Sequence, residues 1–223
     1  MLFCFCELWY NGEKEEAVTI MQYILAVMIG YLLGCSSMAF YVSLVKKKDI
    51  RTAGSGNLGA SNATVLFGWG AGVLVALHDI GKAVLAVFLA RWLFPGAEYA
   101  GAAAGVACVL GHMYPFYLGF RGGKGLASLI GMTIAVNFPV ALGVVILLAV
   151  VTVTTNYIAL GTMALSVVIP IALWVVTGDV WMFVVLLPAA VVMVYKHMEN
   201  VKRIAAGTEI GLRSTAKGEH RVK

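Results

Sequence analysis

Charged residues are scarce in this 223-residue chain. Asp, Glu, Lys and Arg make up only 12% of it, against roughly a quarter in ordinary soluble domains. Hydrophobic residues make up 61%, and apolar segments recur over residues 21–195 with no long polar interval. These features exclude a soluble enzyme, and they also exclude a membrane anchor that carries a separate catalytic domain. The sequence predicts an integral membrane protein whose chemistry lies in short loops between helices.

Cysteine is also scarce, and its placement argues against a metal centre. Cys4, Cys6, Cys35 and Cys108 show no ligand-like pairing with histidine, so we expect neither a bound metal nor a disulfide framework. The net charge is +5, but basic loops are what orient membrane proteins. We therefore expect membrane lipid and small substrates as partners, and no nucleic acid.

We expect no secretory signal in residues 1–20. Residues 1–20 hold an apolar run too short to span a membrane, and the acidic run EKEE stands where a signal peptide would be positive. We expect the native start at Met21 and interpret residues 1–20 as a non-native or poorly ordered extension. Residues 21–211 are then a single membrane domain, and residues 212–223 a basic cytoplasmic tail.

The apolar segments predict an all-α fold, a polytopic membrane bundle of seven transmembrane helices. The expected spans lie near 21–45, 79–94, 99–118, 127–136, 139–154, 157–176 and 180–195. Because a helix needs about 20 apolar residues to cross, the fourth span is the weakest. The glycine-rich stretch 64–77 remains, and we expect it to be a re-entrant or tilted segment packed against protein.

The positive residues predict the orientation of this bundle. Lys46, Lys47, Lys48 and Arg51 follow the first span, Arg121 and Lys124 follow the third, and seven more lie in residues 196–223. The opposite turns, FPGAEY, NF and TGDV, contain no Lys or Arg. By the positive-inside rule the basic side is cytoplasmic, which places the start of the chain outside and its tail inside.

Residues 51–62, RTAGSGNLGASN, fit the Gly-x-Gly-x-x-Gly pattern of a dinucleotide-binding turn, and Asp79 lies at about the right distance downstream. That pattern requires a preceding buried strand, whereas here the polar run KKKDIRTA precedes it. This excludes the dinucleotide interpretation. Ser55, Asn57 and Asn62 are instead candidate donors to phosphate or hydroxyl oxygens, and an ordinary polar turn is the alternative.

The run RGGKG, residues 121–125, has the features of a phosphate-binding loop. Gly122, Gly123 and Gly125 permit close backbone approach to an anion, and Lys124 adds a positive charge. The next span begins directly after this run, so its positive N-terminal end faces the same place. The run is not a Walker A loop, because the lysine is followed by glycine. A flexible basic turn is the alternative interpretation.

His197 and Asn200 lie three residues apart at the end of the last span, and so on one face of a helix. A histidine can accept a proton from a hydroxyl at cytoplasmic pH; the alternative is a helix cap or an interfacial residue. We expect Glu209 either to orient His197 or to pair with Arg203.

Asp79 and Lys82 are also three residues apart, near the cytoplasmic end of the second span. Ionisable residues are costly in a membrane and often functional. They either form a local ion pair that holds the helix end, or Lys82 faces the phosphate-binding loop. We expect His112, which heads the second loop, to be structural.

Three stretches together carry a family resemblance: GSGNLGASN, GHMYPFYLGFRGGKGLAS and HMENVKRIAAGTE. In order and spacing they resemble the three motifs of the bacterial acyl-phosphate:glycerol-3-phosphate acyltransferase family, over residues 21–211. The resemblance implies a seven-helix enzyme of the bacterial inner (cytoplasmic) membrane with its active site facing the cytoplasm. Such an enzyme transfers a fatty acyl group from acyl phosphate to the 1-hydroxyl of glycerol 3-phosphate, giving lysophosphatidic acid. No metal or nucleotide cofactor is implied.

The resemblance also assigns roles to the candidate residues. It implies that Ser55 and the RGGKG loop hold phosphate and that His197 and Asn200 engage the glycerol end. Because acyl phosphate is an activated mixed anhydride, positioning and charge stabilisation suffice. The proton acceptor is either His197 or the phosphate of the substrate. The catalytic candidates are His197, Asn200 and Ser55, and the substrate-binding candidates are Asn57, Asn62, Lys82, Gly122, Gly123, Lys124, Gly125 and Glu209.

The chain departs from the family pattern at four places. No arginine follows the first motif near Val65, Asn156 and Ala159 replace an arginine and a serine, and Gly211 replaces a lysine. These departures leave a second interpretation open, a divergent relative that binds an anionic lipid or phosphorylated metabolite with altered or no turnover. A third interpretation is a small transporter, although the two halves show no inverted repeat.

Overall fold

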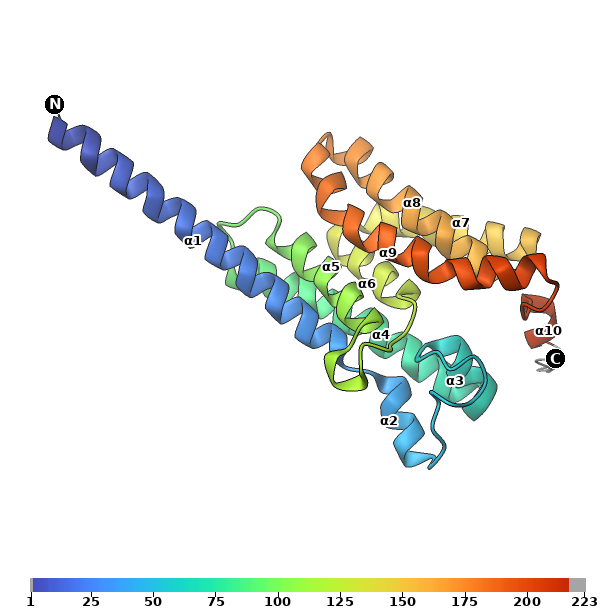
Figure 1. The fold of residues 1–223 in the computed structure, drawn as a ribbon. Coiled ribbons are helices and arrows are strands. Elements are labelled where there is room, and N and C mark those ends of the chain that lie inside the picture. The colour runs from blue at the N-terminus through green and yellow to red at the C-terminus, as the bar shows by residue number, and fades with distance from the viewer. Residues whose placement is uncertain (1, 217–223) are drawn as a thin grey trace.

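The computed structural model describes residues 2–216, and over these residues it contains helices and no strands (Figure 1). The helices are α1 (Leu2–Cys35), α2 (Met38–Val45), α3 (Ala60–Phe67), α4 (Trp69–Leu93), α5 (Ala100–Met113), α6 (Leu126–Val136), α7 (Phe138–Thr155), α8 (Ile158–Thr177), α9 (Val180–Ala205) and α10 (Leu212–Ala216), with a 3₁₀ turn at Phe116–Leu118. The predicted all-α membrane fold is confirmed. Of the predicted tail, residues 217–223 lie outside the described residues.

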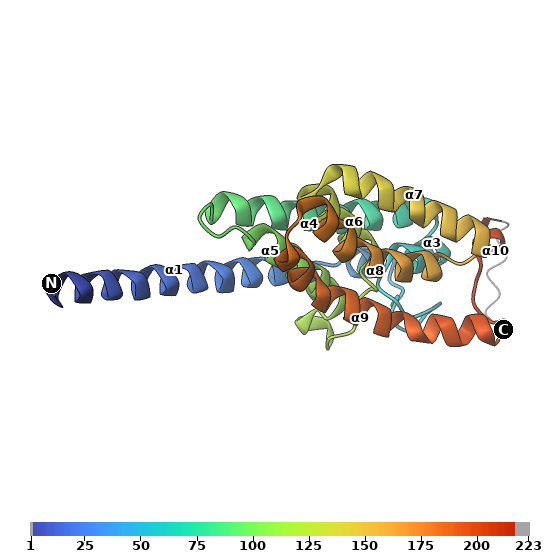
Figure 2. The same ribbon diagram turned by 90° about the horizontal axis from the view of Figure 1, so that it is seen from above.

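Six segments in the described part of the chain are long and apolar enough to cross a membrane, whereas α6 is apolar but shorter. The six are Glu15–Val45, Trp69–Leu93, Ala100–Leu118, Phe138–Thr155, Ile158–Thr177 and Val180–Ala205. Residues 2–20 continue α1, which projects from the bundle in Figures 1 and 2. The native start at Met21 stays a prediction.

The predicted first span, 21–45, is wrong as a single helix, because α1 ends at Cys35 and α2 begins at Met38. Ser37 caps α2, with its hydroxyl accepting the Phe40 N–H at 3.3 Å. The end of a helix leaves carbonyl groups without intrahelical partners. Here the Lys82 ammonium from α4 donates to the carbonyl oxygens of Gly34 at 3.0 Å and Ser36 at 2.7 Å.

The predicted re-entrant or tilted segment 64–77 is also wrong. Residues 64–67 end α3, Gly68 forms the turn, and residues 69–77 belong to α4, which begins at Trp69 rather than near residue 79. The glycines bring α3 and α4 together instead of interrupting α4. A Cβ on Gly72 would lie 1.8 Å from Thr64 Oγ1, so the two helices pack closely just after the turn at Gly68.

Small residues set the contact between α1 and α5, which lie side by side in both ribbon views (Figures 1 and 2). A Cβ on Gly30 would lie 2.1 Å from the carbonyl oxygen of Ala104, and one on Gly34 would lie 2.1 Å from that of Cys108. A four-residue spacing of small residues is typical of close helix packing in membranes. The sequence run GYLLG carried this signal.

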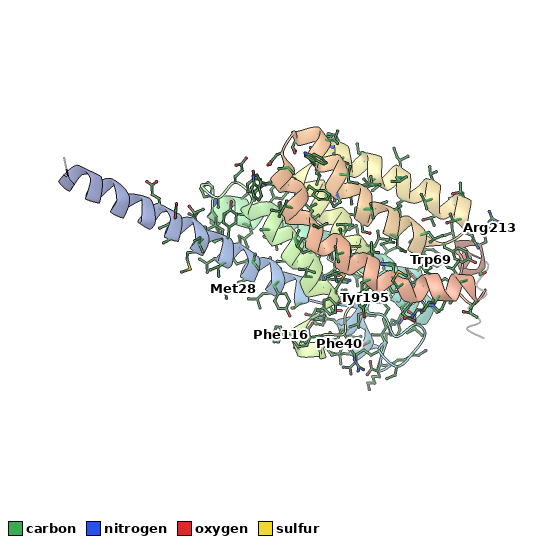
Figure 3. The ribbon with its side chains drawn as sticks, turned by 45° about the horizontal axis from the view of Figure 1, so that its top comes forward. Met28, Phe40, Trp69, Phe116, Tyr195 and Arg213 are labelled. Atoms are coloured by element: carbon green, nitrogen blue, oxygen red, sulfur yellow. The ribbon has the colours of Figure 1, made fainter. Side chains whose placement is uncertain are left out.

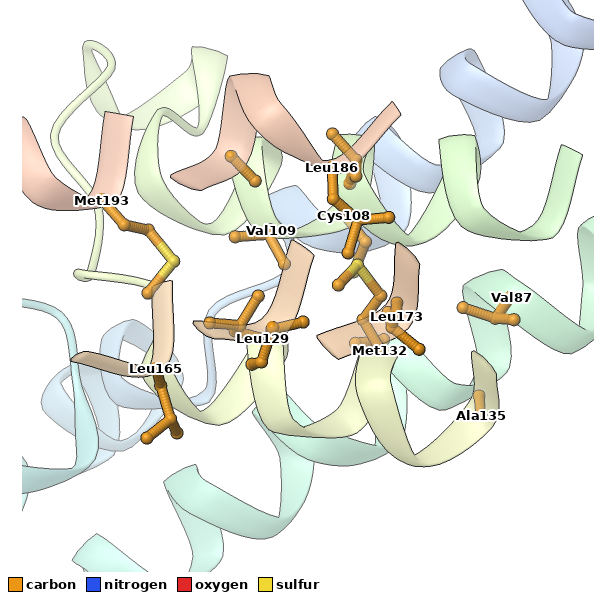
Figure 4. Packing of buried hydrophobic residues seen from close by; sticks show 14 of the residues in the cluster. Val87, Cys108, Val109, Leu129, Met132, Ala135, Leu165, Leu173, Leu186 and Met193 are labelled. Atoms are coloured by element: carbon orange, nitrogen blue, oxygen red, sulfur yellow. The ribbon is translucent and has the colours of Figure 1, made fainter. Parts of the chain in front are cut away.

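The main core lies where the helices from α4 to α9 pack together (Figure 4). Its buried members include Val109 from α5, Met132 from α6, Leu165 from α8 and Met193 from α9. Other apolar side chains point outward from the bundle, among them Met28, Trp69 and Tyr195 in Figure 3. An apolar outer surface of this extent suits helices surrounded by lipid.

Contacts between turns define the two ends of the bundle. At one end, the Tyr99 hydroxyl before α5 donates to Asp179 Oδ2, at the start of α9, over 2.7 Å. The other, which we call the loop end, contains residues 46–59, 114–125 and 206–213. Lys196 near the end of α9 reaches the second of these segments, and Leu58 and Leu118 share one buried cluster that joins the first two.

Candidate functional site

The glycine loop, residues 121–125, folds back onto the end of α5. The N–H groups of Gly122 and Gly123 donate to the carbonyl oxygens of Met113 and His112 at 3.1 and 3.0 Å. A Cβ on Gly123 would lie 1.9 Å from His112 Nε2, so close packing requires glycine there. The prediction that these two N–H groups face an anion is therefore wrong, because both already have carbonyl partners.

The next residues offer anion-binding groups instead. Gly125 is the N-cap of α6, and no side chain caps this helix end. No described hydrogen bond uses the N–H groups of Lys124 or Gly125, and Ser128 Oγ, in the first turn of α6, is buried without a described partner. An uncapped helix N-terminus with free N–H groups attracts anions. The candidate phosphate site thus lies at Lys124, Gly125 and the start of α6.

Lys124 joins the second loop to the third through a chain of polar contacts. Its ammonium donates to Asn200 Oδ1, and Asn200 Nδ2 donates to Glu209 Oε1 at 2.5 Å. The second oxygen of Glu209 accepts a bond from Arg203 Nε at 2.6 Å. Burial and the positive charge of Arg203 lower the pKa of Lys124 to about 8, while Glu209 opposes that shift. The expected pairing of Glu209 with Arg203 is confirmed.

His197 lies one turn from this chain of contacts and is 3% exposed. Its Nδ1 lies 2.8 Å from the carbonyl oxygen of Met193. Because a carbonyl can only accept, Nδ1 carries the proton, and in the neutral ring Nε2 is left with an acceptor lone pair. Because the ring is buried and bonded in this way, His197 is not an exposed interfacial residue. No described hydrogen bond joins His197 to Glu209, whose carboxylate oxygens bond to Asn200 and Arg203 instead. The structure therefore does not support that alternative.

Lys196 is not among the predicted site residues. Its ammonium donates to the carbonyl oxygens of Met113 at 2.7 Å and Gly123 at 3.3 Å, and it lies 4.2 Å from the centre of the Tyr114 ring. Lys196 thus fastens the glycine loop to α5 and adds a second cation beside Lys124. Its position four residues before Asn200 on the same helix face was the available signal.

In the first loop, the Asn62 side chain determines the loop shape. Its Oδ1 accepts the Ser55 N–H at 3.1 Å, and its Nδ2 lies 3.0 Å from the carbonyl oxygen of Asn57 and 3.2 Å from that of Ala53. The expected donation by Asn62 to a substrate is therefore wrong, because its amide is engaged within the loop. Ser55 is exposed, and Asn57 is half-buried.

The glycines of GSGNLG have a conformational explanation. Gly54 and Gly56 have φ values of 59° and 69°, in the left-handed region that glycine adopts without a Cβ penalty. No strand precedes this loop in the described chain, which agrees with the exclusion of a dinucleotide-binding turn. The loop instead packs against the second loop through Leu58 and Leu118.

Lys82 does not face the glycine loop, and that prediction is wrong. Besides the two carbonyl oxygens at the end of α1, its ammonium lies 2.8 Å from Asp79 Oδ1 and 3.0 Å from His112 Nδ1. Lys82, Asp79 and His112 are buried, and together with the two carbonyl oxygens they provide enough acceptors for the three N–H groups of the ammonium. The local ion pair is the correct interpretation. His112 packs against Gly123 and its Nδ1 lies 3.3 Å from Asp79 Oδ1, which agrees with the expected structural role.

The known proteins to which this chain is similar share one description, glycerol-3-phosphate acyltransferase. Residues 24–207 match the family model described as glycerol-3-phosphate acyltransferase. Glycerol-3-phosphate acyltransferase 1 of Oceanobacillus iheyensis is 37% identical over 202 residues, which cover 87% of this chain and 97% of that protein. Glycerol-3-phosphate acyltransferase of Shouchella clausii is 39% identical over 202 residues, with coverages of 85% and 96%.

Two crystal structures of PlsY (YgiH), an integral membrane glycerol 3-phosphate acyltransferase, resemble this fold. The glycerol 3-phosphate form has a TM-score of 0.80 and 30% identity, and covers 87% of this chain and 97% of that one. The lysophosphatidic acid form has a TM-score of 0.77 and 31% identity, with coverages of 85% and 94%.

Proposed function

This chain belongs to the glycerol-3-phosphate acyltransferase family, and on that premise we propose how its loop end carries out the reaction. The enzyme acylates glycerol 3-phosphate to lysophosphatidic acid, as the names and bound forms of its relatives support. The observation that carries the site assignment is the chain of contacts from Lys124 through Asn200 to Glu209, which unites two of the three polar loops.

The charge balance around this chain of contacts suits a phosphate group. Lys124, Lys196 and Arg203 provide three positive charges, against the single carboxylate of Glu209. The Lys124 ammonium donates only one described hydrogen bond, to Asn200. It therefore retains N–H groups for a ligand. The glycerol 3-phosphate anion binds between Lys124 and the uncapped start of α6, where positive charge and free N–H groups combine.

Asn200 and Glu209 hold the lysine rather than the substrate. The Asn200 amide accepts from Lys124 and donates to Glu209, so its two polar atoms both have protein partners. It therefore positions the lysine for phosphate. Ser55, whose hydroxyl has no described hydrogen bond and lies on an exposed loop, remains the candidate from the first loop for holding a phosphate oxygen, with Asn57 beside it.

For the acyl donor we assign acyl phosphate. The 1-hydroxyl oxygen of glycerol 3-phosphate attacks the acyl carbonyl carbon, a new ester bond forms, and the bond between that carbon and the phosphate oxygen breaks, releasing inorganic phosphate. His197 Nε2 takes the hydroxyl proton, since its lone pair is free while Nδ1 bonds to Met193. Because the leaving phosphate is stable, this step requires no covalent intermediate on the enzyme.

We assign seven crossings of a bacterial inner membrane, with the loop end facing the cytoplasm. The helix α6 has 11 residues, about 16 Å at 1.5 Å per residue, which is less than the roughly 30 Å hydrocarbon core. Its C-terminal end is nonetheless tied to the last turn of α4, where Arg91 donates to the Ala135 carbonyl oxygen at 2.7 Å. This contact and the basic residues of the loop end support the assignment.

An assay with purified protein tests this function. The protein is given glycerol 3-phosphate with acyl phosphate, and acyl-CoA and acyl carrier protein serve as parallel donors. We expect lysophosphatidic acid and inorganic phosphate only when acyl phosphate and glycerol 3-phosphate are both present. Transfer from acyl-CoA alone would overturn the donor assignment. Binding of glycerol 3-phosphate without turnover by any donor would favour the divergent binding protein.

A further inference from the structure

Asn156, in the turn between α7 and α8, contacts a segment that lies far away in sequence. Its backbone carbonyl oxygen accepts the Leu212 N–H at 2.7 Å, and its side-chain Oδ1 accepts the Arg213 N–H at 2.9 Å. One residue thus bonds two consecutive N–H groups of the segment that follows the third loop.

Gly211 fits closely against the same side chain. A Cβ at this position would lie 2.1 Å from Asn156 Nδ2 and 2.8 Å from its Cγ. A side chain at 211 and the present position of the Asn156 amide therefore exclude each other. Two of the four positions where the sequence departs from the family pattern, Asn156 and Gly211, are thus in direct contact.

The segment that Asn156 contacts also contains Glu209, the carboxylate of the candidate functional site. Glu209 lies two residues before Gly211, and its oxygens bond to Asn200 and Arg203. On its other side the segment is fastened to α9, where the Thr208 and Glu209 N–H groups donate to the Arg203 carbonyl oxygen at 2.8 and 3.2 Å. Glu209 is thus fixed from α9 before it and from the α7–α8 turn after it.

We propose that Asn156 is a positioning residue, which clasps residues 211–213 so that the Glu209 carboxylate stays against Asn200. Through Asn200 it also determines where the Lys124 ammonium lies. The clasp itself stands on contacts alone, whereas its effect on kinetics rests on the proposed function. Asn156 acts without touching substrate.

The turn conformation and the clasp can be separated by substitution. Asn156 has a φ of 71°, in the left-handed region where glycine and asparagine are the favoured residues. Asn156→Gly therefore keeps the turn and the backbone bond to Leu212. It removes the side-chain bond to Arg213 and the amide that packs against Gly211. Asn156→Asp keeps an oxygen acceptor and is the matched control.

The experiment combines hydrogen exchange with kinetics. In Asn156→Gly we expect faster exchange at the Arg213 N–H and a KM for glycerol 3-phosphate raised about 3- to 10-fold, the scale of one net hydrogen bond, with a smaller change in kcat. Asn156→Asp should remain close to wild type. In a Glu209→Ala background, Asn156→Gly should add little to the KM, because no carboxylate is left to position.

A second pair of variants tests the contact itself. Gly211→Ala should raise the KM in the wild-type background but not beside Asn156→Gly, where the opposing amide is gone. Equal harm in both backgrounds, or unchanged Arg213 exchange and KM in Asn156→Gly, would overturn the proposal. Exchange is measured without substrate. A protein that makes no lysophosphatidic acid but shows the expected exchange therefore retains the clasp and refutes only the proposed function.

Discussion

The Lys124 ammonium donates a hydrogen bond to Asn200 Oδ1, joining the loop between α5 and α6 to the last turns of α9. The two residues lie 76 positions apart in sequence. This contact brings the cation of the second motif to the amide of the third, and it is the reason for treating both loops as one site.

Lys124→Ala should weaken phosphate binding more than it disturbs the fold. A hydrogen bond to a charged group contributes about 1.5 to 3 kcal/mol, so we expect the KM for glycerol 3-phosphate to rise by about 10- to 100-fold. Initial rates at varied glycerol 3-phosphate measure this, with thermal unfolding in detergent as the control. An unchanged KM in a folded variant would remove Lys124 from the phosphate site.

The lowered pKa of Lys124, about 8, predicts a pH dependence. Below this pKa the side chain is a cation, and above it the side chain is neutral, so phosphate affinity should fall as the pH rises from about 7 to 9. Lys124→Arg stays protonated throughout and should show a flatter KM profile. Parallel profiles for the two proteins would mean that another group titrates.

His197→Ala should lower kcat by about 10²- to 10⁴-fold, the usual effect of losing an acid-base group, with a smaller change in KM. The ring also bonds to Met193, so thermal unfolding must be followed in the same variant. Full activity together with lower stability would assign His197 a structural role only.

Lys82→Met should destabilise the protein rather than change substrate affinity. The substitution leaves Asp79 buried beside His112 without its cation and removes the donor for the end of α1. Breaking a buried ion pair costs about 3 to 5 kcal/mol. Thermal unfolding in detergent should therefore shift strongly downward, while residual folded enzyme keeps its KM. A raised KM at unchanged stability would return Lys82 to the substrate site.

The seven-crossing topology predicts opposite accessibility for two engineered cysteines. In a background lacking the four native cysteines, Glu98→Cys in the α4–α5 turn and Ser214→Cys in α10 should react with an impermeant thiol reagent from opposite sides. Labelling of both from the same side would contradict the assignment, and the short helix α6 would be the first crossing to reconsider.

The sequence by itself determined the membrane fold, the polar loops that form the site and the family. Hydrophobicity, charge asymmetry and motif order belong to contiguous stretches, and lipid requires each crossing stretch to be apolar along its own length. The pairing of Glu209 with Arg203 was also accessible, because the two residues lie only six positions apart.

Tertiary structure alone decided which polar groups remain available. Asn62 and the N–H groups of Gly122 and Gly123 looked like ligand donors, yet their partners are backbone carbonyl oxygens within the protein. The Lys82 ammonium donates to carbonyl oxygens at the end of α1, which lie 46 to 48 residues away. A sequence states which donors exist. Only the folded chain decides which of them already have acceptors, because a buried polar group bonds to whatever partner the fold brings near. That partner lies nearby in sequence for Asn62 and on another helix for Lys82.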